Sequence, residues 1–299
     1  MASDPTRRRF IAGTGTVLGA TLAGCTQSSS EEPSDTETTD ETSSSDDETG
    51  GDASTDTATD SETATPSSYT ASLSPVGSVE FDSVPETVFT VYPQYLDMAV
   101  ALGHGEKVNA VYVPEMSGTT MNHYYERLDG VSFDWEGLPD PFGSGISEEE
   151  LYWLDSDVHF LDPAYLVTQD NWSVGDAEDI ASNVGPWFGN FYSGTHDQPP
   201  EQYRDEYEYY TLWELFGHVA DVFGERERYE ALRGVHEDLL ATIEADLPPE
   251  DERPTAVRVT YSDGTFYTYH LNKPGYWLAD TRPLGARDAF AEEDWSNLW

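Results

Sequence analysis

Short apolar runs alternate with amphipathic stretches along the chain from about residue 76 onward. The apolar runs predict buried strands over residues 87–92, 108–113 and 157–161, and a shorter fourth strand over residues 183–188. Between them, residues 94–102 predict a helix, and Ser147 followed by Glu150 has the capping-box spacing that opens another helix through Leu154. Strands that alternate with helices predict an α/β fold with a parallel, doubly wound sheet.

A long helical region follows this first lobe. Apolar side chains fall at helical spacing from Leu212 to Phe223 and, after Gly224, from Tyr229 to Leu247. The second half alone is about 23 residues and would span roughly 35 Å. Because a helical connector is stiff, we expect little hinge motion about it.

The residues after this connector predict the start of a second α/β lobe. Residues 255–261 and 265–269 predict two strands, which pair across the turn signal of residues 262–264. Only about 45 residues follow the connector, and they end at Trp299. We therefore expect the second lobe to be truncated.

The first 25 residues have the features of an export signal. Arg7 and Arg8 lie in a twin-arginine pattern, and an apolar stretch too short to span a membrane runs from there to the lipobox Leu22-Ala23-Gly24-Cys25. Cys25 is the expected site of lipid attachment. The sequence thus predicts twin-arginine export and a lipid anchor on the extracellular face of the cell membrane.

A polar segment separates this signal from the first lobe. Residues 26–68 are almost wholly Ser, Thr, Asp, Glu, Gly, Pro and Ala, with 13 acidic residues and no Lys or Arg. Such a segment cannot bury enough apolar surface to offset the entropy of ordering, which predicts disorder. The expected organisation is a signal at 1–25, an acidic linker at 26–75, an α/β lobe at 76–210, connecting helices at 211–254 and a partial second lobe at 255–299.

Composition narrows the classes of partner. The 299 residues include 58 acidic and 14 basic side chains and carry a formal charge of −44, which excludes nucleic-acid binding. The single cysteine excludes a disulfide framework. The acidic surface and the scarcity of lysine resemble those of proteins from salt-loving archaea.

Three stretches resemble a known family of binding proteins. Residues 96–108 (LDMAVALGHGEKV) are similar to the family's first helix running into "LG…(D/E)KVVGV", and residues 147–158 are similar to "EELLALKPDLV". The third stretch is the helix of residues 223–247 with its following strand. Together they resemble the substrate-binding lipoproteins of ABC importers for ferric siderophores, haem and cobalamin, of a haloarchaeal type.

The resemblance implies a fold and a function. Two α/β lobes would be joined by a rigid helix, with the ligand in the shallow cleft between them. The protein would capture a ferric siderophore or related chelate outside the cell and deliver it to an ABC permease and its ATPase. It would not be an enzyme and would need no cofactor of its own. Haem, cobalamin and bare metal remain open as ligands.

In open α/β lobes, ligands lie beyond the carboxyl ends of the strands, and this rule selects candidate contacts. The candidates are Tyr92, Gln94 and Tyr95 after the first strand, Glu115 and Met116 after the second, Trp187 and Phe188 after the fourth, and Tyr267, Tyr269 and His270 of the second lobe. Their rings suit flat ligands, and Glu, Tyr and His atoms could touch ferric iron. The alternative is that these aromatic residues serve core or lobe packing.

Two other functions were weighed against binding. An extracellular hydrolase is disfavoured because the chain has no G-x-S-x-G elbow and no H-E-x-x-H motif. A structural or adhesive surface lipoprotein is disfavoured because the chain lacks internal repeats. Oligomeric state and glycosylation stay open.

Overall fold

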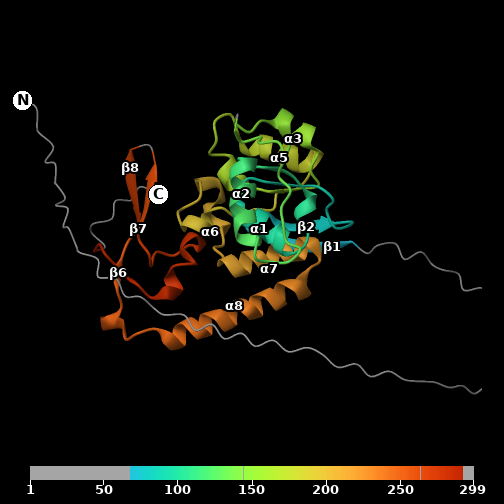
Figure 1. Cartoon of the computed structure of the whole chain (residues 1–299). Coiled ribbons are helices and arrows are strands. Elements are labelled where there is room, and N and C mark those ends of the chain that lie inside the picture. The colour runs from blue at the N-terminus through green and yellow to red at the C-terminus, as the bar shows by residue number, and fades with distance from the viewer. Residues whose placement is uncertain (1–67, 144, 263, 292–299) are drawn as a thin grey trace, which may run out of the picture. The chain divides into compact units, whose positions relative to one another are not determined.

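A computed structural model describes residues 68–143, 145–262 and 264–291 of the protein (Figure 1). The predicted export signal, with Arg7, Arg8 and Cys25, and almost all of the predicted linker lie outside the described residues. In the part of the chain that is described, no helix is both long and apolar enough to cross a membrane.

Three parallel strands form the central sheet, in the order β4-β3-β5. They are β3 (Val88–Thr90), β4 (Val108–Val111) and β5 (Val158–Phe160). Each lies inside a range that the sequence predicts as a strand, and all three pair in parallel register as expected. The fold is thus an α/β fold around a parallel sheet.

Helices cover both faces of this sheet. The helices of the lobe are α1 (Pro93–Ala101), α2 (Pro114–Tyr125), α3 (Glu148–Leu154), α4 (Pro163–Leu166), α5 (Val174–Asn183), α6 (Tyr192–Thr195) and α7 (Leu212–Phe223), with 3₁₀ turns η1 (Gly105–Lys107) and η2 (Glu201–Glu206). Successive strand residues face opposite ways, so Val88 joins the core under α1 and α7. Phe89 joins a second core with Leu151 of α3 and Ile180 of α5. These two cores make the sheet doubly wound, as predicted.

The predicted start of α3 is confirmed in detail. The Ser147 hydroxyl accepts a hydrogen bond from the Glu150 backbone N–H, and the Glu150 carboxylate accepts one from the Ser147 N–H. This reciprocal pair satisfies two backbone donors that the helix itself cannot. Its effect is to fix the loop before α3 at the edge of the sheet.

The folded chain begins earlier than the predicted linker boundary at residue 75. β1 (Tyr69–Leu73) and β2 (Gly77–Phe81) form an antiparallel hairpin. Ala71 and Leu73 point into the core, and the Tyr69 hydroxyl donates to the Val222 carbonyl of α7. The alternation of buried and exposed residues in β1 is only five residues long and lies among Ser and Thr, so the composition of this stretch does not indicate a strand.

The predicted fourth strand at residues 183–188 is wrong. Those residues make only an isolated parallel bridge between Trp187 and His159. Pro186 has no N–H to donate to a ladder. A Cβ at Gly185 would lie 2.4 Å from the Ser156 carbonyl oxygen, so the backbone of this segment packs closely against the residues that lead into β5.

The helical region of residues 212–247 consists of two helices separated at Gly224, as the spacing predicts. Gly224, with φ of 70°, ends α7, and α8 (Arg226–Asp246) begins two residues later. α7 belongs to the lobe, with Leu215, Val219 and Val222 fully buried. α8 is the connector, and Figure 1 shows it continuing past α7 as one uninterrupted helix.

Two of the six apolar positions expected to pack along α8 are exposed. Tyr229 is buried and Leu232 packs against the core, but Val235 and Leu239 are 70% and 55% exposed. The reason is that α7, the helix that α8 packs on, is only twelve residues long. Helical spacing thus predicts the helix correctly. It predicts which face of the helix is buried only for the first turns.

The predicted hairpin after the connector is confirmed. Residues 255–291, here called the C-terminal segment, contain β7 (Arg258–Ser262) paired antiparallel with β8 (Thr265–Tyr269). The segment also holds β6 (Thr255–Ala256) and β9 (Arg287–Asp288), which pair in parallel, and the 3₁₀ turns η4 (Tyr276–Leu278) and η5 (Arg282–Leu284); η3 (Glu250–Glu252) precedes it. In the described part of the chain, this segment forms two-stranded pairs and no larger sheet.

His159, on β5, gives the core a pH dependence that can be measured. Its ring is fully buried, its Nδ1 is 3.0 Å from the Gly185 carbonyl oxygen, and burial lowers its pKa from 6.5 to about 4. A pKa depressed in the folded state means that folding favours the neutral ring. That stabilisation is complete above pH 6.5 and is lost as the pH falls toward 4.

We expect a His159→Asn variant to lose less stability on acidification than the wild type. Between pH 7 and pH 5 its free energy of unfolding should fall by about 2 kcal/mol less, because Asn does not titrate. Denaturant unfolding at both pH values, in molar salt, measures this. His123→Asn, at an exposed position, is the control and should follow the wild type. Parallel falls in the His159→Asn variant and the wild type would contradict the prediction.

Candidate functional site

Aromatic side chains gather at the carboxyl edge of the sheet. Six partly exposed rings form a chain that we call the aromatic band: Tyr112, Phe142, Tyr165, Tyr92, Phe191 and Trp277. Tyr92 follows β3, Tyr112 follows β4, and Tyr165 lies on α4 directly after β5. The strand ends therefore bring together rings that are far apart in the sequence, at the position where open α/β folds bind ligands.

Each ring of the aromatic band contacts the next. Tyr165 is central: its ring centroid lies 4.3 Å from that of Phe191, 5.9 Å from that of Tyr92 and 6.4 Å from that of Phe142. Tyr112 extends the band from Phe142 at 6.3 Å. These separations are ordinary aromatic packing distances, so the band is a continuous apolar surface with several tyrosine hydroxyls.

A buried carboxylate holds the band from behind. Asp162 is fully buried; its oxygens accept hydrogen bonds from the backbone N–H groups of Ala164 and Phe191, both at 2.7 Å, and from the Tyr207 hydroxyl. Burial raises the pKa of Asp162 to about 6, although these hydrogen bonds oppose the rise. Asp162 thereby ties the loop after β5 to the segment that carries Phe191.

The Tyr92 hydroxyl is left without a protein partner. It is buried and has no hydrogen bond among the described residues. Burial raises the pKa of Tyr92 well above its ordinary value, and the nearby Asp162 carboxylate adds to the rise. An uncompensated buried hydroxyl is costly, so its place inside the band calls for an explanation.

The loop after β4 is held in a strained conformation. Val113, with φ of 44°, is a β-branched residue in the left-handed region, which costs about 1–3 kcal/mol. Its backbone N–H donates to Asp140 at 3.1 Å, and Asp140 also accepts from the Gly143 N–H at 2.9 Å. One carboxylate thus positions the residues next to both Tyr112 and Phe142.

The C-terminal segment supplies the last ring of the band. The Trp277 ring meets Phe191 edge-on at 5.8 Å, and Tyr276 beside it is buried in the core of the lobe. Gly194 makes this approach feasible, because a Cβ there would lie 2.4 Å from the Trp277 Nε1 atom. Lys273 pairs with Asp197 at 3.0 Å and adds a second link.

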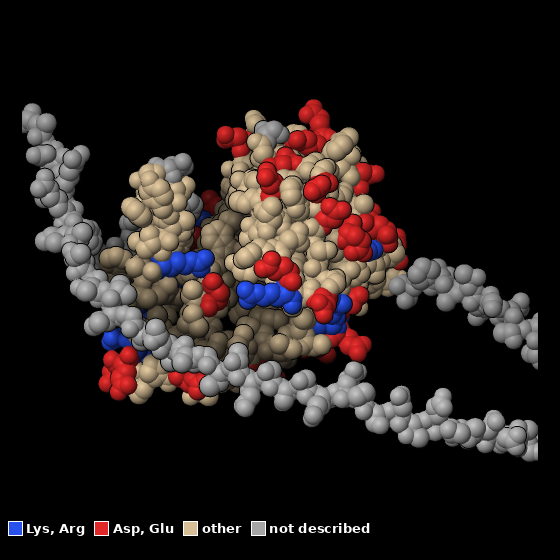
Figure 2. Space-filling model, in the orientation of Figure 1, with Lys and Arg blue, Asp and Glu red and all other residues tan. Residues whose placement is uncertain are grey.

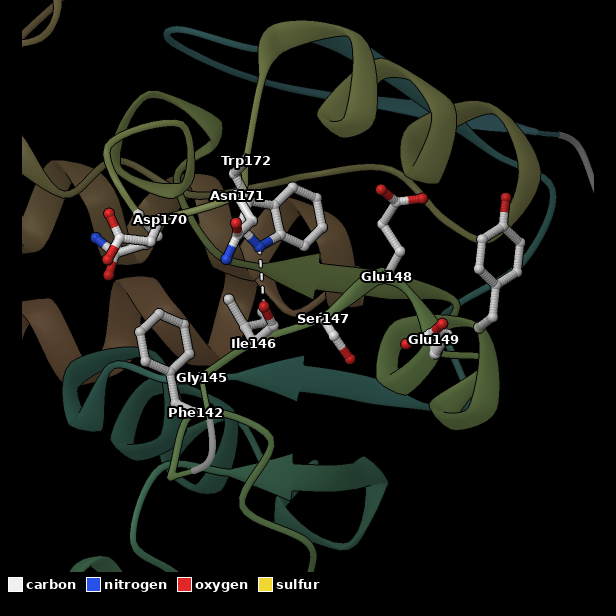
Figure 3. A pocket seen from close by; sticks show the side chains of 11 residues that line it. Phe142, Gly145, Ile146, Ser147, Glu148, Glu149, Asp170, Asn171 and Trp172 are labelled. Carbon is white, nitrogen blue, oxygen red and sulfur yellow. Dashed lines mark hydrogen bonds between the residues drawn. The ribbon is translucent and has the colours of Figure 1, made fainter.

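A cavity adjoins the band at Phe142. Its volume is about 670 Å³, large enough for a small organic ligand. It is lined by Phe142, Gly145, Ile146, Ser147, Glu148, Glu149, Tyr152, Gln169, Asp170, Asn171 and Trp172. Figure 3 shows Phe142 and Asp170 toward one end, Glu148 and Glu149 toward the other, and Trp172 between them, donating to the Ile146 carbonyl at 3.0 Å.

The candidate contacts from the sequence lie in different parts of the structure. Tyr92 lies in the aromatic band; Gln94 and Tyr95 lie beside it on α1, where the buried Tyr95 hydroxyl accepts from the Asn190 N–H. Trp187 and Phe188 are 3% and 0% exposed, as the core-packing alternative expects.

The remaining candidates lie on α2 and in the C-terminal segment. Glu115 and Met116 are exposed in the first turn of α2. The Tyr269 ring lies under Arg258, and His270 lies 3.1 Å from Asp288, so both have contacts inside the C-terminal segment. Tyr267 is half-buried on β8. Among the described residues no group of three or more His, Cys, Asp or Glu is placed to hold a metal ion.

Five members of the band were not among the candidates. Tyr112 was within reach of sequence reasoning, because it ends the second predicted strand. Phe142, Phe191 and Trp277 lie in irregular segments without periodicity, and Tyr165 lies on a four-residue helix. Only the contacts between these segments reveal them.

Comparison with known proteins gives distant structural similarity. No family model matches the sequence, and no curated protein matches it. Among solved structures, a periplasmic binding protein from Veillonella parvula is similar at 15% identity and a TM-score of 0.49, over 76% of this chain and 66% of that one. SirA of Staphylococcus aureus, complexed with staphyloferrin B, has 15% identity and a TM-score of 0.48, over 75% of this chain and 64% of that one.

A third structure is similar to the same degree. The iron uptake ABC transporter substrate-binding protein PiuA from Streptococcus pneumoniae has 13% identity and a TM-score of 0.48, over 76% of this chain and 68% of that one. This chain therefore spans about two thirds of the length of each of the three. The likeness is a distant one.

Proposed function

We propose that this protein is the extracellular substrate-binding component of an ABC importer, and that it captures a ferric siderophore or related chelate on the aromatic band. The observation that carries the proposal is the band itself: three rings follow the carboxyl ends of the parallel strands, two lie in irregular loops of the lobe, and one comes from the C-terminal segment. A chelate presents flat organic faces around its metal, and aromatic faces bind such surfaces with little loss of side-chain entropy.

The unpartnered Tyr92 hydroxyl supports the same interpretation. The hydroxyl belongs to a ring of the band and can donate a hydrogen bond to an oxygen of a ligand. The neighbouring Asp162 carboxylate has no proton to donate when it is ionised. The chelator supplies the iron ligands in this proposal, and the protein recognises the organic shell.

The remaining parts of the proposal come from the sequence. Arg7 and Arg8 would direct export by the twin-arginine route, and a lipid on Cys25 would anchor the chain. An ABC permease with its ATPase would then receive the ligand. Mass spectrometry of the membrane-bound protein tests the anchor: a mature N-terminus at a lipidated Cys25 is expected, and an intact leader would contradict it.

A binding experiment with a matched pair of variants tests the central claim. Ferric chelates titrated into the full chain should quench tryptophan fluorescence and release heat. Tyr165→Ala, at the centre of the band, should weaken binding at least about tenfold, a loss of about 1.4 kcal/mol. Tyr124→Ala removes a tyrosine that is 71% exposed on α2 and should leave the affinity unchanged.

Folding must be checked separately in these variants. Circular dichroism and thermal unfolding show whether Tyr165→Ala retains the native fold. Equal weakening by both variants, or unchanged affinity in a folded Tyr165→Ala, would count against the band as the binding surface. Absence of binding by any chelate would reject the proposed function.

A further inference from the structure

Carboxylates lie beside the rings at several places in the aromatic band. Asp162 contacts the backbone of Phe191 from behind, and Asp140 contacts the residues next to Tyr112 and Phe142. Both Asp140 oxygens accept backbone hydrogen bonds, which fixes the carboxylate beside the rings. Any ligand on the band is therefore near fixed negative charge.

The adjoining cavity carries more of the same charge. Glu148, Glu149 and Asp170 line it, and Phe142 is common to the cavity and the band (Figure 3). The N-terminus of α3 offsets part of the charge of the two glutamates, whereas Asp170 lies outside any helix. None of the eleven lining residues is Lys or Arg.

Three basic side chains of the C-terminal segment are already engaged with protein groups, and one of them, Arg258, donates to the Trp277 carbonyl at 3.2 Å. Lys273 pairs with Asp197 at 3.0 Å, and Arg258 lies 3.4 Å from Asp280. Arg282 donates to the backbone carbonyls of Lys273 and Gly275. An anionic ligand would have to share these cations with the protein groups that already neutralise or engage them. Figure 2 shows Asp and Glu scattered over the visible face of the lobe, with Lys and Arg mostly along its lower part.

From these contacts we infer that the ligand of this site is an electrically neutral or positively charged chelate, and that the site rejects anionic ones. The inference rests on the proposed function and narrows it. Ring faces carry negative potential and attract cations, and the carboxylates act in the same direction. Three hydroxamates neutralise ferric iron, so a ferric tris-hydroxamate fits, and one with a pendant ammonium group fits better. Tris-catecholate chelates, carboxylate-rich chelates and haem, with its propionates, do not.

Three chelates of similar size and different charge test this inference. The full chain is titrated with a neutral ferric tris-hydroxamate, a tris-hydroxamate with a pendant ammonium group, and a triply negative ferric tris-catecholate. At about 0.1 M salt we expect the catecholate to bind about a hundredfold more weakly than the ammonium form. Molar salt should narrow the gap, because the Debye length falls to about 3 Å.

Two double variants test which carboxylates cause the preference for the positively charged chelate. Glu149→Gln with Asp170→Asn removes two carboxylates from the cavity, and should reduce the preference for the ammonium form over the catecholate about fivefold. Glu244→Gln with Asp246→Asn removes two from the far end of α8 and should leave the preference unchanged.

The outcomes separate the two proposals. If the catecholate binds as tightly as the ammonium form, the charge inference is overturned and the proposed function stands. If the catecholate binds more weakly but the cavity variant keeps the full preference, the part of the inference that assigns selectivity to Glu149 and Asp170 is overturned. If none of the three chelates binds, the proposed function itself fails.

Discussion

Replacing Gly189 with alanine is expected to lower the free energy of unfolding by at least about 3 kcal/mol. A Cβ at this position would lie 2.3 Å from the Leu161 carbonyl carbon and 2.5 Å from the Asp162 nitrogen, both backbone atoms that cannot rotate away. Relief requires the segment around Gly189 to move off β5. That movement breaks the Phe188 N–H bond to the His159 carbonyl (2.8 Å) and the Phe191 bond to Asp162.

A second glycine provides the matched control. Gly234 lies inside α8, where an added Cβ would meet no atom within 4 Å. Alanine is a better helix former than glycine, so Gly234→Ala should raise stability by about 0.5–1 kcal/mol. Denaturant unfolding of both variants measures the contrast. A Gly189→Ala variant as stable as the wild type would show that the segment does not need this close approach.

The three strands of the sheet and the helices α1, α3, α7 and α8 were predictable because each has a local signal, whereas α2, α4, α5 and α6 were not predicted. β3, β4 and β5 are continuous apolar runs, and α3 is announced by Ser147 and Glu150. The fourth strand was mispredicted because residues 183–188 are apolar for another reason: they fill the space beside β5, with Trp187 donating to the Ala177 carbonyl. Apolar character shows that a segment is buried, but a strand also needs a run of hydrogen bonds to its neighbour, and among the described residues the backbone bonding of this segment to β5 is limited to the single bridge at Trp187.

The sequence predicts the edge of the sheet at which the candidate site lies, but not most of the residues that form it. The rule that ligands lie beyond the strand ends led to Tyr92 and to the carboxyl edge of the sheet, where the aromatic band lies. Which other rings reach that edge depends on long-range contacts: Trp277 is 86 residues from Phe191 in the sequence, yet their ring centroids are 5.8 Å apart. No periodicity in the sequence records such a contact. The same holds for Asp162, whose partner Tyr207 lies 45 residues away.

Asp162 joins the loop after β5 to Phe191 and Tyr207 by hydrogen bonds. We therefore expect Asp162→Ala to lower the free energy of unfolding by about 3 kcal/mol at pH 7. The change leaves the N–H groups of Ala164 and Phe191 and the Tyr207 hydroxyl without their acceptor, at about 1–3 kcal/mol each. It also removes a carboxylate whose ionisation is unfavourable in the folded protein, since burial raises its pKa from 3.8 to about 6, and this offsets part of that loss.

The pH dependence distinguishes this carboxylate from a merely structural residue. Because the folded-state pKa of Asp162 is raised, its contribution is fully present below pH 3.8 and is lost as the pH rises through 6. The substitution should therefore cost about 1 kcal/mol more at pH 5 than at pH 7. Asp134→Ala, at an exposed aspartate, should change stability by less than about 0.5 kcal/mol at either pH. Chelate affinity should fall in the Asp162→Ala variant as Phe191 loosens, and a cost that does not change with pH would show that Asp162 is ionised without penalty in the folded protein.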